Sequence, residues 1–135
     1  MYLKKYENND ARECMKTYTK LLENPFIQEW LDDPSDILMY ILYDDKDDVK
    51  SFATLTMMKK DPLNIHSHPK QLQYIYTFDE NRRKGYATHL LHELKKIENT
   101  TAFVTDDNVR GLFTKAGYNF HAYDSLYSFP IYRYP

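Results

Sequence analysis

The fold is decided by the stretch Tyr74-Ile75-Tyr76-Thr77-Phe78-Asp79-Glu80-Asn81-Arg82-Arg83-Lys84-Gly85-Tyr86-Ala87-Thr88. Residues 74–78 are rich in aromatic and β-branched side chains, which predicts a strand. Beyond the turn, apolar side chains recur at helical spacing and predict an amphipathic helix. The apolar face of this helix comprises Ala87, Leu90, Leu91, Leu94 and Ile97.

A basic turn joins this strand to this helix. The first turn of a helix presents N–H groups that have no partner within the helix, at the positive end of the helix dipole. Such a turn binds anions, and phosphate is the usual ligand. Arg82, Arg83 and Lys84 add positive charge directly before Gly85. The turn is therefore a candidate phosphate site. The alternative interpretation is an ordinary corner with solvated cations.

The turn also resembles a known signature. Residues 82–87, Arg82-Arg83-Lys84-Gly85-Tyr86-Ala87, resemble the R/Q-x-x-G-x-G/A signature of the GCN5-related N-acetyltransferases, the GNAT superfamily. In that family the turn holds the pyrophosphate of acetyl-coenzyme A (acetyl-CoA) through backbone amides. The resemblance implies acetyl-CoA as the cosubstrate. It also implies cofactor contacts from Arg82, Arg83, Lys84, Gly85, Tyr86, Ala87 and Thr88.

A second stretch, residues 106–118, resembles the N-x-x-A-x-x-L-Y-x-K-x-G-F helix of the same family. Leu112, Lys115 and Gly117 match, and Tyr118 stands for the final aromatic residue. Asp106 falls on the family's asparagine, and Asn108 is the alternative if the helix begins two residues later. In the family this helix lies along the pantetheine arm. The resemblance therefore implies cofactor contacts from Asn108, Phe113 and Lys115.

Phe113 is the main departure from the family pattern. Many members carry a tyrosine there, which protonates the departing thiolate of coenzyme A, whereas phenylalanine has no hydroxyl. The proton then comes from another group or from water, or the thiolate leaves unassisted. The departure also leaves open a protein that binds an acyl-CoA without catalysis.

The strand before the turn has a role in the family that involves its backbone. The resemblance implies that this strand diverges from its neighbour, so that Ile75, Tyr76 and Thr77 pair with the pantetheine amides as an added strand would. A strand N–H is also a candidate for polarising the thioester carbonyl. The family's base is frequently a carboxylate near this strand, but residues 71–78 contain none. The catalytic residues therefore stay unknown.

The order of the expected elements covers the whole chain. The patterns predict strands over residues 2–6, 37–43, 49–57, 74–78, 101–105, 118–123 and 126–132, and helices over residues 11–22, from Pro25 to Leu31, 86–97 and 106–116. Asn9 or Asp10 is the expected cap of the first helix. This order, β-α-α-β-β-β-α-β-α-β-β, is that of the GNAT fold. The resemblance thus implies an α/β (α+β) fold with a central, mixed, mostly antiparallel sheet flanked by helices.

Composition sets the broad class. A chain of 135 residues predicts a single domain over residues 1–135, and 42% apolar with 28% charged residues is ordinary for a globular protein. A net charge of −2 does not favour a nucleic-acid partner. No apolar run approaches the roughly 20 residues that span a bilayer, and residues 1–6 lack a secretory signal. With one cysteine, Cys14, expected in the core, the cytoplasm is the simplest compartment.

The histidines raise the question of a metal. His66 and His68 lie in a proline-containing loop, and His89 and His92 lie one helical turn apart. Their spacing matches no established set of ligands, so no metal site is predicted. His89 and His92 are expected to flank the buried face of their helix.

These observations favour an N-acetyltransferase that moves the acetyl group of acetyl-CoA to a primary amine by direct attack. The expected partners are acetyl-CoA and an amine acceptor of unknown identity, with no nucleic acid and no membrane. One alternative is an acyl-CoA-binding module of the same fold. Another is an interaction protein with a tyrosine-rich surface and no cofactor, since the chain contains 13 tyrosines. Whether the chain forms a homodimer is left open by the sequence.

Overall fold

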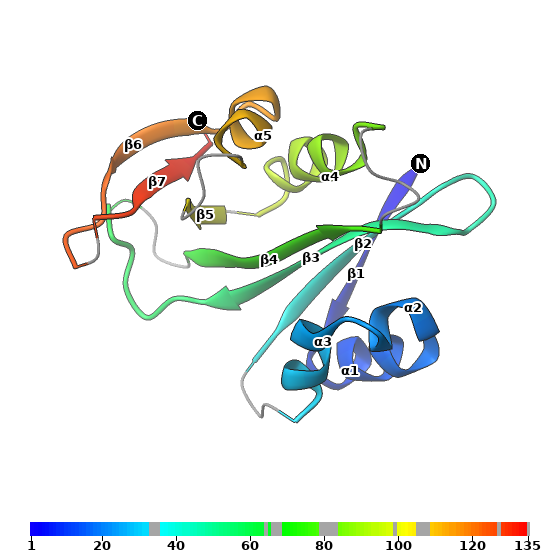
Figure 1. Cartoon of the computed structure of the whole chain (residues 1–135). Coiled ribbons are helices and arrows are strands. Elements are labelled where there is room, and N and C mark those ends of the chain that lie inside the picture. Colours follow the sequence, from blue (N-terminus) through cyan, green and yellow to red (C-terminus); the bar gives the residue numbers. More distant parts are fainter. Residues whose placement is uncertain are drawn as a thin grey trace.

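The computed structural model describes residues 1–32, 36–63, 65, 69–78, 84–98, 100–104, 109–126 and 128–134. Its elements are β1 (Tyr2–Glu7), α1 (Asn8–Thr17), α2 (Thr19–Leu22), α3 (Pro25–Leu31), β2 (Leu38–Tyr43), β3 (Val49–Met57), β4 (Lys70–Thr77), α4 (Tyr86–Leu94), β5 (Thr100–Phe103), α5 (Arg110–Lys115), β6 (Asn119–Tyr123) and β7 (Pro130–Arg133) (Figure 1).

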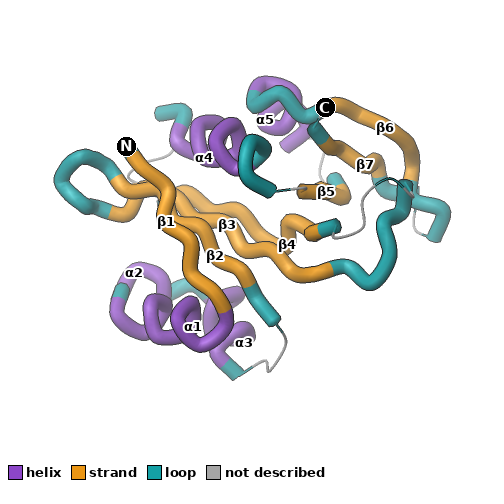
Figure 2. Tube along the Cα trace, turned by 180° about the vertical axis from the view of Figure 1, so that it is seen from behind, coloured by secondary structure: helices purple, strands orange, loops and turns teal. Residues whose placement is uncertain are grey.

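The described strands form one seven-stranded sheet in the order β1-β2-β3-β4-β5-β7-β6. All neighbours pair antiparallel except β4 and β5, which run parallel. Helices α1, α2 and α3 lie on one face of this sheet, and α4 and α5 lie on the other (Figures 1 and 2). The expected mixed, mostly antiparallel sheet flanked by helices is confirmed.

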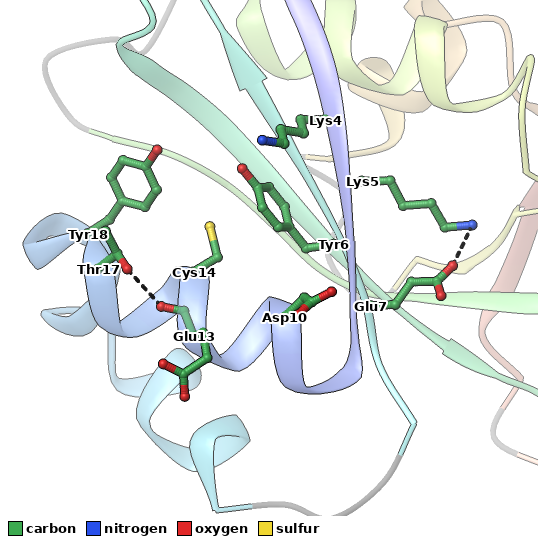
Figure 3. Close-up of a pocket in the computed structure, with 9 residues that line it drawn as sticks. All are labelled: Lys4, Lys5, Tyr6, Glu7, Asp10, Glu13, Cys14, Thr17 and Tyr18. Atoms are coloured by element: carbon green, nitrogen blue, oxygen red, sulfur yellow. Dashed lines mark hydrogen bonds and ion pairs between the residues drawn. The ribbon is translucent and has the colours of Figure 1, made fainter.

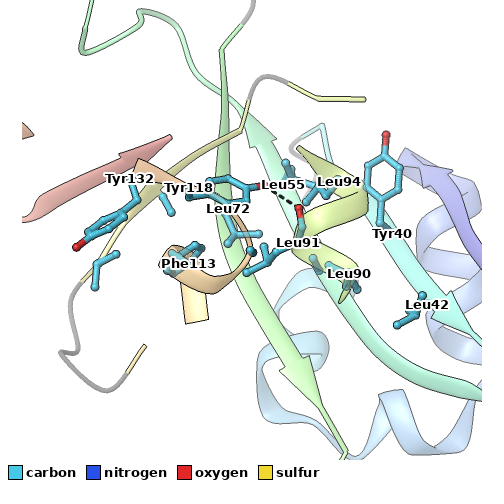
Figure 4. Close-up of a cluster of buried hydrophobic side chains, with 14 residues drawn as sticks. Tyr40, Leu42, Leu55, Leu72, Leu90, Leu91, Leu94, Phe113, Tyr118 and Tyr132 are labelled. Carbon is cyan, nitrogen blue, oxygen red and sulfur yellow. Dashed lines mark hydrogen bonds between the residues drawn. The ribbon is translucent and has the colours of Figure 1, made fainter. Parts of the chain in front are cut away.

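Each face of the sheet carries its own core. On one face, Leu90, Leu91 and Leu94 of α4 are fully buried against β2, β3 and β4 (Figure 4). On the other face, Ala11 and Met15 of α1 and Ile27 of α3 cover a second buried cluster. Strand β2 lies between the two clusters, which explains why residues 38–43 form an unbroken apolar run.

The prediction for the first helix is wrong about both its start and its end. Asn9 and Asp10 lie inside α1, and Glu7 is its N-cap residue, with no side-chain cap. The helix also ends at Thr17, because Tyr18 has extended backbone angles (φ −99°, ψ 110°). The hydroxyl of Tyr18 lies 3.1 Å from that of Tyr43 in β2. The contact lies at the break between α1 and α2, which helical periodicity does not reveal.

Other boundaries also differ from the expected ones. Helix α4 ends at Leu94, and Ile97, expected on its buried face, is 57% exposed. The last strand begins at Pro130 rather than at residue 126. The predicted helix over residues 106–116 is described only from residue 109, where α5 follows as Arg110–Lys115.

A buried ion pair fixes the long connection between β3 and β4. The guanidinium of Arg133 in β7 donates to both carboxylate oxygens of Asp61, at 2.5 and 3.0 Å. It also donates to the hydroxyl of Thr101 in β5. The backbone N–H groups of Leu63 and Ile65 donate to the same carboxylate. Asp61 therefore ties this loop to the sheet near the pairing of β4 with β5.

Candidate functional site

Strands β4 and β5 diverge after a short parallel contact. Within residues 69–78 and 100–104 they pair only at Lys70 with Thr100 and at Gln71 with Thr101. Strand β4 then runs on to Thr77, and within the described strands its pairing there is with β3. The divergence that the family resemblance implied is therefore present. The backbone N–H and C=O groups of β4 that face away from β3 therefore form a strand edge beyond the contact with β5.

A bulge in β4 sets which side chains face which core. Tyr74 pairs with Thr54 and Leu72 with Leu55, so Gln73 is the extra residue. Leu72 and Ile75 consequently pack into the same core, on the side of α4. Tyr74 and Tyr76 pack against the other core.

Ile75, Tyr76 and Thr77 occupy the end of β4 that has no β5 partner in the described chain. They pair with Ala53, Phe52 and Ser51 of β3. The hydroxyl of Ser51 donates to the carbonyl of Tyr76 at 2.8 Å and lies 3.0 Å from the hydroxyl of Thr77. This end of β4 is therefore held firmly on its β3 side.

The turn after β4 ends in a left-handed residue that starts a helix. Gly85 has φ +80° and ψ 11° and precedes Tyr86, the first residue of α4. Its carbonyl accepts the N–H of His89 at 2.9 Å, which is the first bond of the helix. Among the described residues no side chain caps this end, and the first turn contains no acidic residue. The N–H groups of Tyr86, Ala87 and Thr88 thus lack helical partners and point out of the helix start.

Two described cations lie at this helix start. Lys84 is exposed directly before Gly85. The ammonium of Lys50, at the beginning of β3, lies 5.9 Å from the centre of the Tyr86 ring and 3.4 Å from a carboxylate oxygen of Asp44. Sequence reasoning missed Lys50, because the hairpin of β2 and β3 brings it to the turn from far away in the chain. Arg82 and Arg83 lie outside the described residues.

Asp44 holds Lys50 from a hydrogen-bonded hairpin turn. The backbone N–H groups of Asp48 and Lys46 donate to its carboxylate at 3.0 and 2.8 Å. These bonds, with the neighbouring Lys50, lower the pKa of the Asp44 carboxyl group. Asp44 is therefore ionised at neutral pH and keeps the Lys50 side chain beside α4.

Phe113 belongs to the core. It is 4% exposed, and its ring centre lies 5.7 Å from that of Tyr118 and 6.1 Å from that of Tyr132 (Figure 4). Lys115 is exposed in the last turn of α5. Asn108 lies outside the described residues. Of the three contacts implied for this helix, only Lys115 presents an exposed, described side chain.

A cavity of about 610 Å³ lies between β1 and α1, away from the diverging strands (Figure 3). Its lining includes Cys14, Tyr6 and Tyr18. Both tyrosine hydroxyls lie within hydrogen-bonding distance of the hydroxyl of Tyr43, at 2.9 and 3.1 Å. Cys14 is 8% exposed, as expected of a core residue, and burial raises the pKa of its thiol.

The remaining sequence expectations concern metals and membranes. Within the described part of the chain, no three His, Cys, Asp or Glu side chains form a group that could hold a metal ion. His89 is partly buried and His92 is exposed, while His66 and His68 lie outside the described residues. None of the described helices is long and apolar enough to cross a membrane.

Solved structures provide the comparison with known proteins. No protein-family model matches the sequence, and no curated protein matches it. Tetrahymena GCN5 aligns with a TM-score of 0.60 at 14% identity, over 99% of this chain and 95% of that one. The aminoglycoside 6'-N-acetyltransferase AAC(6')-Ih of Acinetobacter baumannii gives 0.54 at 15% identity, over 87% and 91%. Arabidopsis thaliana NAA60, solved with a bisubstrate analogue, gives 0.55 at 11% identity, over 98% and 95%. The chain therefore has the fold of the GCN5-related N-acetyltransferases.

Proposed function

We propose that the protein is an N-acetyltransferase that moves the acetyl group of acetyl-CoA to a primary amine by direct attack. The observation that carries this proposal is the divergence of β4 from β5 beside the uncapped start of α4. One strand–turn–helix unit thereby combines a strand edge that faces away from β3 with the N–H groups of a helix start. Structural neighbours that are N-acetyltransferases support the same general chemistry.

The pyrophosphate of the cosubstrate binds the N–H groups at the start of α4 in this proposal. Gly85 and the backbone of Tyr86, Ala87 and Thr88 supply the donors, since an uncapped helix start attracts anions. Arg82, Arg83 and Lys84 contribute positive charge from the turn. We add Lys50 to this set because its ammonium lies beside Tyr86.

The pantetheine arm pairs with the side of β4 that faces away from β3. The backbone of Ile75, Tyr76 and Thr77 supplies N–H and C=O groups for this pairing, as in strand addition. Lys115 approaches the arm from the side of α5, and Asn108 stays a further proposed contact from the sequence resemblance. Phe113 supports α5 from within the core. We therefore propose that Phe113 packs behind the cofactor and takes no part in the chemical step.

The reaction forms a bond between the amine nitrogen and the acetyl carbon and breaks the bond from that carbon to sulfur. The amine loses a proton, because an ammonium ion has no lone pair, and the coenzyme A thiolate leaves and takes up a proton. A β4 N–H directed at the thioester oxygen stabilises the negative charge that develops there. Phe113 has no hydroxyl to donate, so we assign protonation of the thiolate to water.

The test begins with binding. Mass spectrometry of the purified protein and calorimetric titration with CoA should both reveal one bound CoA per chain. Release of free CoA thiol from acetyl-CoA should then depend on an added primary amine. Binding of CoA without amine-dependent release would instead support the acyl-CoA-binding module. Absence of CoA binding would refute the proposal.

We further propose the cytoplasm as the compartment, where acetyl-CoA is available and a buried thiol stays reduced.

A further inference from the structure

Strand β1 forms one end of the described seven-stranded sheet, so one of its edges faces away from β2. Its pairing with β2 shows which backbone groups lie at this edge. The N–H of Asn8 donates to the carbonyl of Ile37 at 2.9 Å, at the next position of the same register. Antiparallel pairs alternate between positions that exchange hydrogen bonds and positions that do not. The N–H and C=O groups of Leu3, Lys5 and Glu7 therefore point away from β2.

Two cavities flank this edge, one on each face of β1. The cavity of about 610 Å³ lies between the strand and α1, and residues 4–7 of β1 form one of its walls (Figure 3). One face of α1 forms the opposite wall, which comprises Asp10, Glu13, Cys14 and Thr17. A second cavity, of about 320 Å³, lies on the face of Lys5 and Glu7, and its lining includes Leu38, Leu55 and Met57. The edge is thus a strand backbone between two cavities.

An extended peptide segment fits a strand edge of this kind. A segment that pairs with β1 directs successive side chains to opposite faces of the sheet, and each face has its own cavity. In such strand addition the main chain supplies the hydrogen bonds, and pockets for alternate side chains supply selectivity.

The charges of the larger cavity favour a cation in the occupant. Its lining includes three carboxylates, those of Glu7, Asp10 and Glu13, and two ammonium groups, those of Lys4 and Lys5. The ammonium of Lys5 lies 3.0 Å from a carboxylate oxygen of Glu7, so this pair is neutral. Two carboxylates and one ammonium group then remain, and the excess charge is negative.

We propose that the outer edge of β1 binds an extended peptide segment of a partner protein, which carries one Lys or Arg side chain flanked by apolar residues. The segment adds to the sheet as a further strand beside β1. Its cation enters the cavity beside Asp10, and its apolar neighbours pack on the other face against Leu55 and Met57. Binding at this edge does not depend on acetyl transfer.

A second copy of the chain is a less favourable occupant. The two antiparallel registers in which two β1 strands overlap most are centred on Lys4 and on Lys5. Each of them places two lysines directly opposite each other, and like charges at such positions are destabilising. Lysines at sheet edges oppose pairing between copies in this way.

The test uses a pool of short fluorescein-labelled peptides in which valine, leucine, isoleucine or threonine flank a central arginine. Fluorescence anisotropy with the full chain should show saturable binding with a Kd below about 1 mM. The same peptides with glutamate in place of arginine should bind about tenfold more weakly. The amide protons of Lys5 and Glu7 should exchange more slowly with solvent in the complex, since they gain partners. Absence of saturable binding, or equal affinity for the arginine and glutamate peptides, would overturn the proposal.

Two variants of one residue separate backbone pairing from charge. Lys5→Pro removes an N–H that points away from β2, and proline is tolerated at such a position of an edge strand. Lys5→Gln removes the same charge but keeps the N–H, and it is the matched control. We expect Lys5→Pro to bind the arginine peptides about tenfold more weakly than Lys5→Gln does. Equal affinities of the two folded variants would overturn the proposal.

A third variant keeps the proposal testable if Lys5→Pro does not fold. Asp10→Asn should weaken binding of the arginine peptides by about tenfold or less, whereas Glu93→Gln, on α4, should leave it unchanged. Equal effects of these two variants would contradict the assigned position of the cation. Sedimentation of the unliganded chain gives a separate check. A dimer that forms in the parent protein and is lost in Lys5→Pro would place a second copy at this edge and overturn the proposal.

Discussion

The carboxylate of Glu98 lies 2.5 Å from the ammonium of Lys70, and the two side chains are only 6% and 19% exposed. The hydroxyl of Tyr40 in β2 donates to the same carboxylate at 2.5 Å, and the ammonium of Lys5 in β1 lies 3.5 Å away. Glu98 follows the C-terminal end of α4. It therefore anchors the helix that carries the proposed phosphate site to three strands of the sheet.

Removing this carboxylate should destabilise the fold. Glu98→Gln leaves Lys70 largely buried without its counter-ion, and loss of one partner of a buried pair costs up to about 3–5 kcal/mol. Because the cluster is not fully enclosed, we expect about 2–3 kcal/mol in the free energy of unfolding, measured with urea. The matched control is Glu93→Gln, whose exposed pair with Lys96 at 3.3 Å should contribute less than about 1 kcal/mol. Equal effects of the two variants would contradict the assignment.

The same carboxylate predicts a dependence of stability on pH. Burial raises the pKa of Glu98, but hydrogen bonds from Lys70 and Tyr40 outweigh it, and the net pKa is lowered. A lowered pKa in the folded state stabilises the protein above the ordinary carboxyl pKa. That contribution is lost as pH falls through the folded pKa. The difference in unfolding free energy between wild type and Glu98→Gln should therefore be fully present above the ordinary glutamate pKa of about 4.3 and shrink as pH falls from there through the lower folded-state pKa. A constant difference would show that Glu98 does not titrate in this way.

Gly85 offers a test that separates backbone conformation from phosphate binding. Its φ of +80° disfavours any residue with a side chain, although a Cβ there would contact no atom of the described residues within 4 Å. Gly85→Val should therefore lower stability by about 1–2 kcal/mol and weaken CoA binding, since the turn must leave its present geometry. Asparagine tolerates left-handed angles, so Gly85→Asn should keep most of the stability and report on the approach of the phosphates. Parental CoA affinity in a folded Gly85→Val variant would place the pyrophosphate elsewhere.

The cations at the same helix start should attract the phosphates of CoA electrostatically, and dissolved salt should screen this attraction. Neutralising Lys84 or Lys50 is expected to weaken CoA binding by about tenfold or less and to flatten its salt dependence. The effect of Lys50→Gln should be the smaller, because Asp44 already neutralises part of its charge. Lys96→Gln, beyond the far end of α4, is the control. Titrations at low and high salt decide the point. Complete loss of binding in a folded Lys84→Gln variant at both salt levels would show that side chains, rather than amides, hold the phosphates.

What the sequence predicted correctly depends on local pattern. Side-chain periodicity predicts the strand at residues 74–77 and the helix after the turn. The single glycine between them predicts a residue with positive φ. All three signals come from residues that are neighbours in the sequence. The break at Tyr18 does not follow from periodicity, because it involves a hydroxyl contact with Tyr43 in another element. Lys50 joins the site only through strand pairing. The Asp61–Arg133 pair likewise joins residues from distant parts of the chain. Long-range polar contacts of this kind leave no periodic signal in one sequence.

Phe113 provides the sharpest test of how the thiolate is protonated. Its ring is packed between Tyr118 and Tyr132, so a hydroxyl added by Phe113→Tyr enters the core. A buried hydroxyl without a partner costs about 1–3 kcal/mol, and we expect this loss in the free energy of unfolding. We expect no increase in the single-turnover rate of acetyl transfer, because the side chain at position 113 is held in the core. Phe113→Leu is the control for altered packing without a hydroxyl. A rate that rises in Phe113→Tyr but not in Phe113→Leu would show that this side chain turns toward the thioester when the cosubstrate is bound. The tyrosine of the variant would then protonate the thiolate. In the parent protein, water would take this role only because Phe113 has no hydroxyl.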